Sequence, residues 1–496
     1  MARGPPFDCC LRQRSGRRTD ADAAFALGYA HAEDDFPTIE EVMASSRGRL
    51  GEITGRDGAA IDYVHHLLGV RGDVEERYES DLSAETRAVV EAYADGLNLY
   101  AARHPEELRL AGLFPVTGQD IAAYTTMTLP FFFGLDRTIT ALVEGEDPPR
   151  DGADPNERGS NAFAVAPSRS PDGETQLILN SHQPWSGPVA WYEAHATSLE
   201  GLDMLGGLFP GAPLPLTGHN RHLGWANTVN RPDLVDVYEL TLSEDGDSYR
   251  FDNQWRPLEK RRVWLNVRIG PLVVPVPQTI HRSVHGPVIV NERGAFAIRY
   301  AGIGDVRAME QYYRLTRATN FEEWRAAMAM QAIPATNFIY ADAEGHIGLF
   351  YNARFPSRGA GHDWRGVLRG DTSETLWSDY APFEAFPRLV DPASGFIVNS
   401  NNSPCFASAA ADNLDCGDYS PLLGVEFFET NRAIRAIELL TALDAITPEA
   451  LLQIKYDTGV ARGSIMGRYF ESLLALDAGD PPTGRAQALL ARWDWN

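Results

Sequence analysis

The sequence predicts an α+β fold, and three observations lead to this class. Residues 21–141 carry apolar side chains at helical spacing. Residues 142–159 form an acidic segment with almost nothing to bury, and residues 160–496 begin as a succession of strand-like runs and end in helices. A chain of 496 residues can bury a large core. We therefore expect a helical region, an exposed linker and a strand-rich region, in that order.

The helical region follows an N-terminal stretch, residues 1–20, that is rich in Arg and that we expect to be disordered or aberrant. The best-defined helix is predicted at 83–104, where Ser83 suits an N-cap. Its apolar residues between Val89 and Leu97 share one face. A second apolar stretch follows at 120–133.

The segment EGEDPPRDGADPNERG, residues 144–159, is dominated by Pro, Gly, Asp and Glu, which indicates an exposed linker. An ordinary surface loop is the alternative. Beyond the linker, strands are expected at 161–167, 175–180, 222–229, 235–240, 262–269, 287–291 and 295–300, and a pair of strands within 337–351. Helices are expected at 307–316, at 320–331, from Thr447-Pro448 onward and at 484–494.

Composition and motifs exclude several classes of function. The net charge of −24 repels phosphate backbones, so nucleic acid is not an expected partner. Lys260 and Lys455 are the only lysines, which argues against Schiff-base chemistry and Ser-Lys dyads. No apolar run reaches about 18 residues, so no membrane span is expected. GxSxG, HExxH and phosphate-loop motifs are missing, and GSIMG at 463–467 has the wrong spacing.

The four cysteines form no metal-binding pattern. Cys9 and Cys10 lie in the N-terminal stretch, whereas Cys405 and Cys416 lie in a loop-like segment. A disulfide between the latter two would suit an oxidising compartment, and two free thiols are the alternative.

The junction between Gly159 and Ser160 could carry chemistry, because it ends the linker and directly precedes a strand. If the chain is cut there, Ser160 gains a free α-amine, whose pKa of about 8 lets it act as a base near neutral pH. A serine hydroxyl needs such a base to be a useful nucleophile. By itself, however, a Gly-Ser pair before a strand is equally typical of a turn.

Several stretches resemble the penicillin acylase family of N-terminal serine amidohydrolases. The matching stretches, which occur in the family's order, are FALGYAHAEDDFPTIEEV (25–42), GSNAFAVAP (159–167), LILNSHQPW (177–185), GLFPGAPLPLTGHNRHLGWANTVN (207–230), DLVDVY (233–238), PATNFIYADAEGHIGLFYNARFPSR (334–358) and GFIVNSNNSP (395–404). The resemblance implies a four-layer αββα fold of two antiparallel sheets between helical layers. It also implies self-cleavage into an α chain and a β chain that starts at Ser160.

The resemblance assigns catalytic roles to five residues. Ser160 is the nucleophile, and His182 orients its amine or relays its proton. The backbone N–H of Val229 and the side-chain amide of Asn337 hold the oxyanion. Arg358 lies near the amine and keeps it unprotonated, although Arg354 is close in sequence and is an alternative. A structural role remains the alternative for the histidine and for the asparagine.

No cofactor is expected for catalysis, but the resemblance implies a structural calcium held by Asp233 and Asp236. The glutamate that the family adds from the α chain has no clear counterpart within 138–145. Trp185 and Trp191 could line an acyl pocket or belong to the core.

The expected function is hydrolysis of an N-acyl amide, with acyl-homoserine lactones, penicillin-type β-lactams and related acyl amides as substrate classes; His182 favours the lactones. The resemblance implies a periplasmic or secreted protein, although no signal peptide is recognisable, and we expect a C-terminally truncated β chain. The alternatives are an unprocessed relative that acts as a binding protein and a secreted sugar-binding β-protein.

Overall fold

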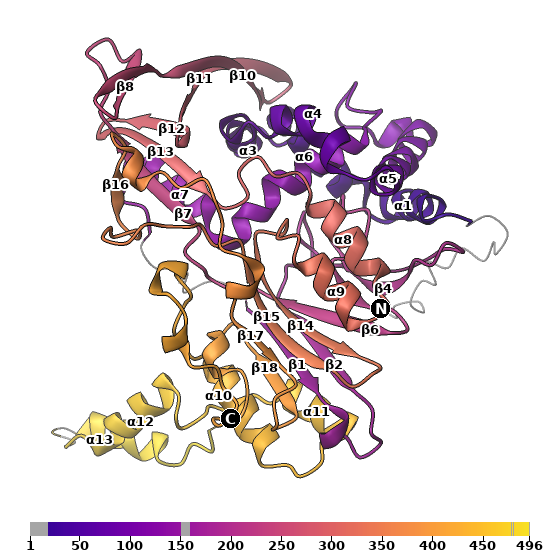
Figure 1. Cartoon of the computed structure of the whole chain (residues 1–496), viewed down its shortest axis with the longest axis vertical. Coiled ribbons are helices and arrows are strands. Elements are labelled where there is room, and N and C mark those ends of the chain that lie inside the picture. The colour runs from indigo at the N-terminus through magenta and orange to yellow at the C-terminus, as the bar shows by residue number, and fades with distance from the viewer. Residues whose placement is uncertain (1–17, 150–158, 478, 480, 496) are drawn as a thin grey trace.

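The computed structural model describes residues 18–149, 159–477, 479 and 481–495, and it has the expected α+β class (Figure 1). The disordered stretch expected at 1–20 is wrong at its end, because Asp20 begins a helix that Thr19 caps. Its residues 1–17, and residues 150–158 of the linker, lie outside the described ranges. Figure 1 shows the N-terminal helices, in indigo and purple, gathered beside the strands that follow them.

The described residues before the linker form helices. They are α1 (Asp20–Ser46), α2 (Gly51–Thr54), α3 (Arg56–Leu68), α4 (Val70–Asp81), α5 (Ala84–Arg103), α6 (Gly118–Thr128) and α7 (Leu135–Glu144), with 3-10 turns η1 (Pro105–Glu107) and η2 (Leu129–Phe133). The helix predicted at 83–104 is α5, and the Ser83 hydroxyl caps it by accepting from the N–H of Thr86. α1 packs so closely on α5 that a Cβ at Gly28 would lie only 2.3 Å from the carbonyl oxygen of Tyr93.

Two antiparallel sheets form the centre of the strand-rich region, with strand orders β18-β1-β2 and β17-β15-β14-β6-β5-β4-β3. Their strands are β1 (Ser160–Val165), β2 (Gln176–Ser181), β3 (Tyr192–Thr197), β4 (Asp203–Leu208), β5 (Thr217–His219), β6 (Leu223–Thr228), β14 (Ala335–Asp342), β15 (Ile347–Ala353), β17 (Arg388–Val390) and β18 (Phe396–Asn399). Small and branched side chains such as Ala162, Ala226 and Ile339 share one buried cluster between these sheets.

Helices pack on strands of both sheets. α10 (Asn431–Thr441) and α11 (Pro448–Lys455) bury Leu440 and Leu451 in one cluster with Phe163 of β1. On the seven-stranded sheet, α9 (Phe321–Met328) places Trp324 with its ring centre 4.7 Å from that of Tyr340. α8 (Ala308–Arg317) lies beside α9 (Figure 1). The helices expected at 307–316 and 320–331 are therefore confirmed.

A six-stranded sheet, ordered β10-β11-β12-β13-β7-β16, extends from this centre (Figure 1). Its strands are β7 (Val235–Leu240), β10 (Glu259–Ile269), β11 (Leu272–Ser283), β12 (Gly286–Asn291), β13 (Gly294–Tyr300) and β16 (Val367–Arg369), with a separate hairpin of β8 (Ser248–Phe251) and β9 (Gln254–Pro257). The sequence did not predict β11, which contains Pro275 and Pro277. Both prolines lie where β11 pairs with β10 alone, so the missing N–H groups cost no pairing with β12.

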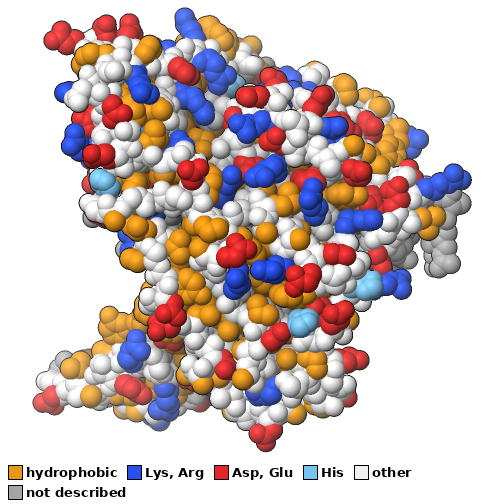
Figure 2. Space-filling view, viewed as in Figure 1, with side chains coloured by type: hydrophobic (Ala, Val, Ile, Leu, Met, Phe, Trp, Pro, Cys, Tyr) orange, Lys and Arg blue, Asp and Glu red, His pale blue; other side chains and the backbone are white. Residues whose placement is uncertain are grey.

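The C-terminal residues form α12 (Ile465–Ala475) and α13 (Pro481–Leu490), which project as a separate lobe at the lower left (Figure 1). Short 3-10 turns complete the chain at η3 (Pro167–Arg169), η4 (Ser373–Thr375), η5 (Phe383–Ala385), η6 (Pro404–Phe406), η7 (Cys416–Asp418) and η8 (Pro421–Leu423). Figure 2 shows acidic and basic side chains mixed over this face of the molecule. Across the described ranges, no helix combines the length and apolar character that crossing a membrane requires.

Candidate active site

Ser160 is the first residue of β1, and only 3% of it is exposed. It is paired with Ser181 of β2, so it lies at the end of the three-stranded sheet and not inside a turn. Its hydroxyl makes no hydrogen bond to any described residue, and Ser160 lines an apolar cavity. The Gly-Ser junction therefore places Ser160 in the wall of a cavity, which the turn alternative does not explain.

The backbone N–H of Ser160 donates a 2.6 Å hydrogen bond to Oδ1 of Asn401. The amide of the same Asn401 donates to the carbonyl of Val229 over 2.8 Å. Asn401 has φ of +64°, a left-handed conformation that asparagine adopts more readily than most residues. One asparagine thus joins the nitrogen of the candidate nucleophile to the segment expected to supply an oxyanion donor.

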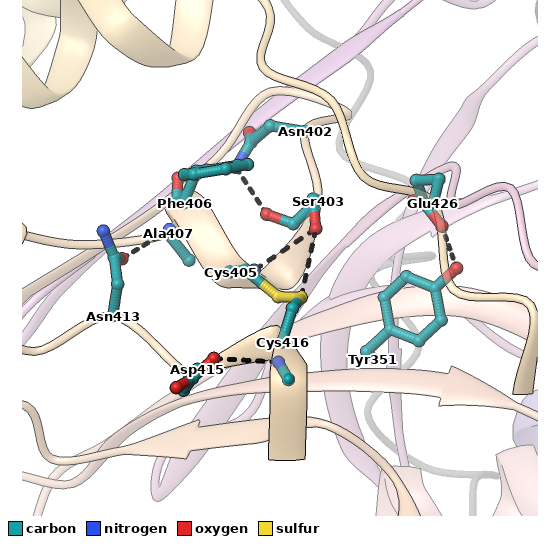
Figure 3. Close-up of a disulfide and its surroundings, with 11 residues drawn as sticks. Tyr351, Asn402, Ser403, Cys405, Phe406, Ala407, Asn413, Asp415, Cys416 and Glu426 are labelled. Carbon is teal, nitrogen blue, oxygen red and sulfur yellow. Dashed lines mark hydrogen bonds between the residues drawn. A yellow bond between two sulfur atoms is a disulfide. The ribbon is translucent and has the colours of Figure 1, made fainter. Parts of the chain in front are cut away.

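The loop that carries Asn401 is fixed by a disulfide and by hydrogen bonds (Figure 3). Cys405 and Cys416 are bonded, with Cα atoms 5.8 Å apart, so the structure selects the disulfide over two free thiols. The side chain of Asn402 donates to the carbonyl of Phe406 over 2.8 Å. These bonds restrict the segment that directly follows Asn401.

Asn337 is fully buried on β14, where it is paired with Thr228 of β6. Its Nδ2 donates to the Thr228 hydroxyl over 3.1 Å, and that hydroxyl donates to Oδ1 of Asn399 over 2.6 Å. The strand pairing therefore brings Asn337 beside the residue that precedes Val229. In this arrangement its amide contacts protein groups and does not line the cavity.

His182 directly follows β2 and contacts the Gly159–Ser160 junction through its backbone. Its N–H donates to the carbonyl oxygen of Gly159 over 2.9 Å. The His182 side chain is half-buried and makes no hydrogen bond to the described residues. Burial, and then the positive charge of Arg432, lower the pKa of His182, which favours a neutral imidazole.

Arg432, the second residue of α10, touches the junction although the sequence analysis did not single it out. Its guanidinium donates to the carbonyl of Ser160 over 2.5 Å and to Oδ1 of Asn401 over 2.9 Å. It also donates to the side-chain oxygen of Asn161. Arg432 lies 272 residues after Ser160, and no local pattern links the two positions.

Arg358 does not contact Ser160 in this structure. Its guanidinium binds Asp233 over 2.9 Å and Asp236 over 3.0 Å, and its side chain is 1% exposed. Arg354, the alternative, binds Asp305 over 2.5 Å and stacks on Tyr380. The arginine beside the nucleophile is therefore neither of the two that the sequence suggested.

The Asp233–Asp236 pair does not fit a calcium ion in this arrangement. Calcium takes six to eight oxygen ligands, and the oxygens of this pair already accept from Arg358. Oδ2 of Asp236 accepts a further hydrogen bond of 2.6 Å from the indole N–H of Trp377. Burial raises the pKa of Asp236 to about 6, although the charge of Arg358 opposes that rise. A guanidinium therefore occupies the place between the carboxylates that a cation would need.

The cavity beside Ser160 has a volume of about 80 Å³ and a mostly apolar lining. Its aromatic lining residues are Tyr124, Phe132, Trp191, Phe209 and Tyr312, and its polar ones include Ser160, Ser181, Gln183, Asn227 and Thr228. Trp191 stacks on Phe209 with ring centres 4.3 Å apart. Trp185, by contrast, is fully exposed and does not line the cavity. Of the two tryptophans proposed for an acyl pocket, only Trp191 lies there.

Several known proteins are similar to this chain in sequence or in structure. The family described as penicillin amidase matches residues 18–496. The acyl-homoserine lactone acylase PvdQ of Pseudomonas fluorescens is 27% identical over 445 residues, which cover 78% of this chain and 57% of that protein. The penicillin acylase 2 proenzyme of a Pseudomonas species is 27% identical over 532 residues, which cover 96% and 66%.

Among solved structures, the thermostable penicillin G acylase from Alcaligenes faecalis matches with a TM-score of 0.56 and 25% identity, over 68% of this chain and 59% of that chain. The present chain thus spans between 57% and 66% of the length of these two curated relatives.

Proposed function

The chain belongs to the penicillin amidase family, and we propose that it is a self-processing acylase whose nucleophile is Ser160. The observation that carries this proposal is the position of Ser160. It follows the linker, begins a buried strand and lines an apolar cavity, while Asn401 holds its nitrogen. The side-chain hydroxyl and the future amine of one residue thus lie together at a place where a substrate can bind.

In the proposed maturation, the Ser160 hydroxyl attacks the carbonyl carbon of Gly159. The His182 N–H, which donates to that carbonyl oxygen over 2.9 Å, stabilises the negative charge that develops there. The peptide C–N bond breaks as the nitrogen of Ser160 takes a proton, and an ester remains. Water then hydrolyses the ester, which frees the hydroxyl and the α-amine of Ser160.

In the mature enzyme, the α-amine takes the proton of the Ser160 hydroxyl as its oxygen attacks the substrate carbonyl. The N–H of Val229, which lines the cavity, holds the oxyanion in this proposal, and the Asn337 amide joins it by leaving the Thr228 hydroxyl. The amide C–N bond breaks, the leaving amine takes the proton, and water releases the acid from the acyl-enzyme. His182, with its lowered pKa, would remain a neutral group beside the amine.

The apolar cavity suggests the substrate class. Aromatic and aliphatic lining residues favour an apolar acyl group over a charged one. Relatives are named as acylases of acyl-homoserine lactones and of penicillins. We therefore propose N-acyl amides of these two classes, or close analogues, as substrates, without a metal in the reaction.

The layering of the fold and the location of the protein belong to the same proposal. The helices that pack on the two stacked sheets support an αββα layering. The Cys405–Cys416 disulfide supports an oxidising, periplasmic or secreted location.

The activity is tested by incubating the purified protein with acyl-homoserine lactones of graded chain length and with penicillin G, and by measuring the freed amine. Hydrolysis of at least one class by the wild type, and none by Ser160→Ala, is expected. Equal hydrolysis by both proteins would exclude Ser160 as the nucleophile, and no hydrolysis of any member would reject the acylase assignment.

A further inference from the structure

A second cavity, with a volume of about 660 Å³, lies between the end of α3, the start of α4 and the strands β10 and β11. Figure 1 shows these strands arching over the top of the molecule close to α3. The cavity shares no lining residue with the one beside Ser160. Its charged lining residues are Arg71, Glu259, Lys260, Arg261 and Arg282. Four cations and one anion thus line one space in a chain whose net charge is −24.

The last turn of α3 holds two of these cations in place. The guanidinium of Arg261 donates to the carbonyl of His66 over 2.8 Å, and that of Arg282 donates to the carbonyl of Leu68 over 3.4 Å. Carbonyls at the end of a helix have no partner within the helix, so they are free to accept these bonds. A guanidinium carries five N–H donors, and neither arginine makes another side-chain hydrogen bond to the described residues. Both are therefore oriented by the fold and keep donors for a ligand.

The positive charge around the cavity is only partly neutralised. Arg71 pairs with Glu75 and Asp120, Lys260 pairs with Asp247, and Arg282 lies near Asp73. Arg261, by contrast, forms no ion pair with any residue that the structure describes. Its charge acts on the neighbouring imidazole, because burial and then Arg261 lower the pKa of His66. An anion in the cavity would supply the missing counter-charge.

His65 provides a second, independent indication of a ligand. It lines the same cavity and is 3% exposed, and its buried Nδ1 has no hydrogen-bond partner among the described residues. Burial, and then the charges of His66, Arg261 and Arg71, lower the pKa of His65 to about 3, so its imidazole is neutral at physiological pH. A buried polar nitrogen without a partner is costly, and a ligand rich in oxygen atoms is a partner that would remove this cost.

We propose that this cavity binds the esterified phosphate group of a small molecule. The planar fork of a guanidinium matches two phosphate oxygens at once, and a lysine adds a compact charge. A phosphate monoester carries more negative charge than a carboxylate, which suits several cations around one space. The volume also leaves room for the group that bears the phosphate.

The two lysines of the chain make the test specific to this site. Lys260 lines the cavity, whereas Lys455 ends α11 and does not. The purified wild type is labelled with a trace of acetic anhydride, and mass spectrometry measures both lysines in the same sample. Over a titration to about 20 mM inorganic phosphate, labelling of Lys260 relative to Lys455 should fall at least about threefold, because occupied sites shield the amine. Sodium chloride at equal ionic strength controls for screening and should leave the ratio unchanged.

Variants then identify the residues that bind. Arg261→Gln and Arg282→Gln should each lose the protection of Lys260. The matched control is Arg268→Gln, because Arg268 also lies on β10 and donates to a helix carbonyl, that of Glu52, but does not line the cavity. It should retain the protection. If neither of the two cavity variants folds, the wild type decides, because equal labelling in phosphate and in chloride overturns the proposal. Full protection in both folded cavity variants would also overturn it.

The source of the phosphate is resolved by two further probes. Glucose 6-phosphate represents a free ester, and vesicles of equal parts phosphatidic acid and phosphatidylcholine represent a lipid headgroup. The probe that protects Lys260 at the lower phosphate concentration identifies the source. Protection by inorganic phosphate alone, with no effect of either ester, would contradict the proposal that the cavity takes an esterified phosphate.

Discussion

The backbone N–H of Ser160 donates a hydrogen bond of 2.6 Å to the side-chain oxygen of Asn401, a residue 241 positions later in the chain. Because Asn401 also donates to the carbonyl of Val229, one side chain links the candidate nucleophile to the candidate oxyanion segment. The Cys405–Cys416 disulfide closes the loop that begins four residues after Asn401.

Replacing Asn401 by alanine removes the acceptor of the Ser160 nitrogen and the donor to Val229. We expect kcat/KM to fall by roughly 10- to 100-fold, because a buried polar group left without its partner costs about 1–3 kcal/mol. Initial rates should be measured on the processed fraction only, as quantified by intact mass. Asn253→Gly, which changes an asparagine at φ +60° in a surface turn, is the matched control and should retain full activity. Full activity of processed Asn401→Ala would contradict the role.

Trp191 lines the cavity and Trp185 does not, so the two tryptophans form a matched pair. Trp191→Ala should enlarge the acyl pocket and raise the preference for dodecanoyl over hexanoyl substrates by about tenfold, as measured by the ratio of kcat/KM values. Trp185→Ala should leave that ratio unchanged. If the Trp191 substitution also leaves it unchanged, the acyl chain binds elsewhere.

Arg358 lies between Asp233 and Asp236 in the place where a cation was expected. Chelation with EDTA should therefore leave the melting temperature of the wild type unchanged. Arg358→Met should destabilise the fold by about 3–5 kcal/mol, because it leaves the fully buried Asp236 without a counter-charge. Arg369→Met, at an exposed pair with Asp371, is the control and should melt like the wild type. A clear drop in melting temperature on chelation would show that a metal contributes.

Buried histidines make the fold sensitive to acid. Burial lowers the pKa of His31 to about 3, where Tyr93 and Tyr192 surround its ring. The unfolded chain, with a histidine pKa near 6.5, therefore binds one more proton than the fold between about pH 6.5 and 3. The contribution of His31 to stability is complete above pH 6.5 and falls by about 1.4 kcal/mol per pH unit below it.

This pH dependence is measured by urea unfolding of the uncut Ser160→Ala chain at pH 7.5 and 5.5, so that a single covalent species unfolds. His31→Gln should reduce the loss of unfolding free energy between the two pH values by about 1.4 kcal/mol. His222→Gln, at an exposed histidine, should not change it. An unaltered loss in His31→Gln would show that His31 is not the group that titrates.

The sequence suggested those candidate site residues that lie in continuous motifs. Ser160 and Asn337 lie in strands, and Val229 directly follows one, whose alternation and turns are visible locally. Strand pairing places Asn337 beside Thr228, the residue before Val229, whereas Ser160 lies in the other sheet. Asn401 and Arg432 could not be predicted in the same way. Both lie more than 200 residues after Ser160, and the packing of α10 and of the segment around Asn401 on β1 brings them to it.

Two other differences between the sequence prediction and the structure have local physical reasons. Strand β11 was not predicted because it contains two prolines, which are tolerated there since that part of β11 pairs with β10 alone. The Asp233–Asp236 spacing suits a cation as well as a guanidinium, and only the fold shows that Arg358 reaches both carboxylates.

The central claim is that Ser160 becomes the N-terminus of a separate chain, and intact-mass analysis with N-terminal sequencing of the purified wild type tests it most directly. We predict two chains, one of which begins SNAFAV, and a single uncut chain for Ser160→Ala. A wild type that remains one chain while it hydrolyses N-acyl amides, or a Ser160→Ala variant that is still cut before residue 160, would contradict the claim.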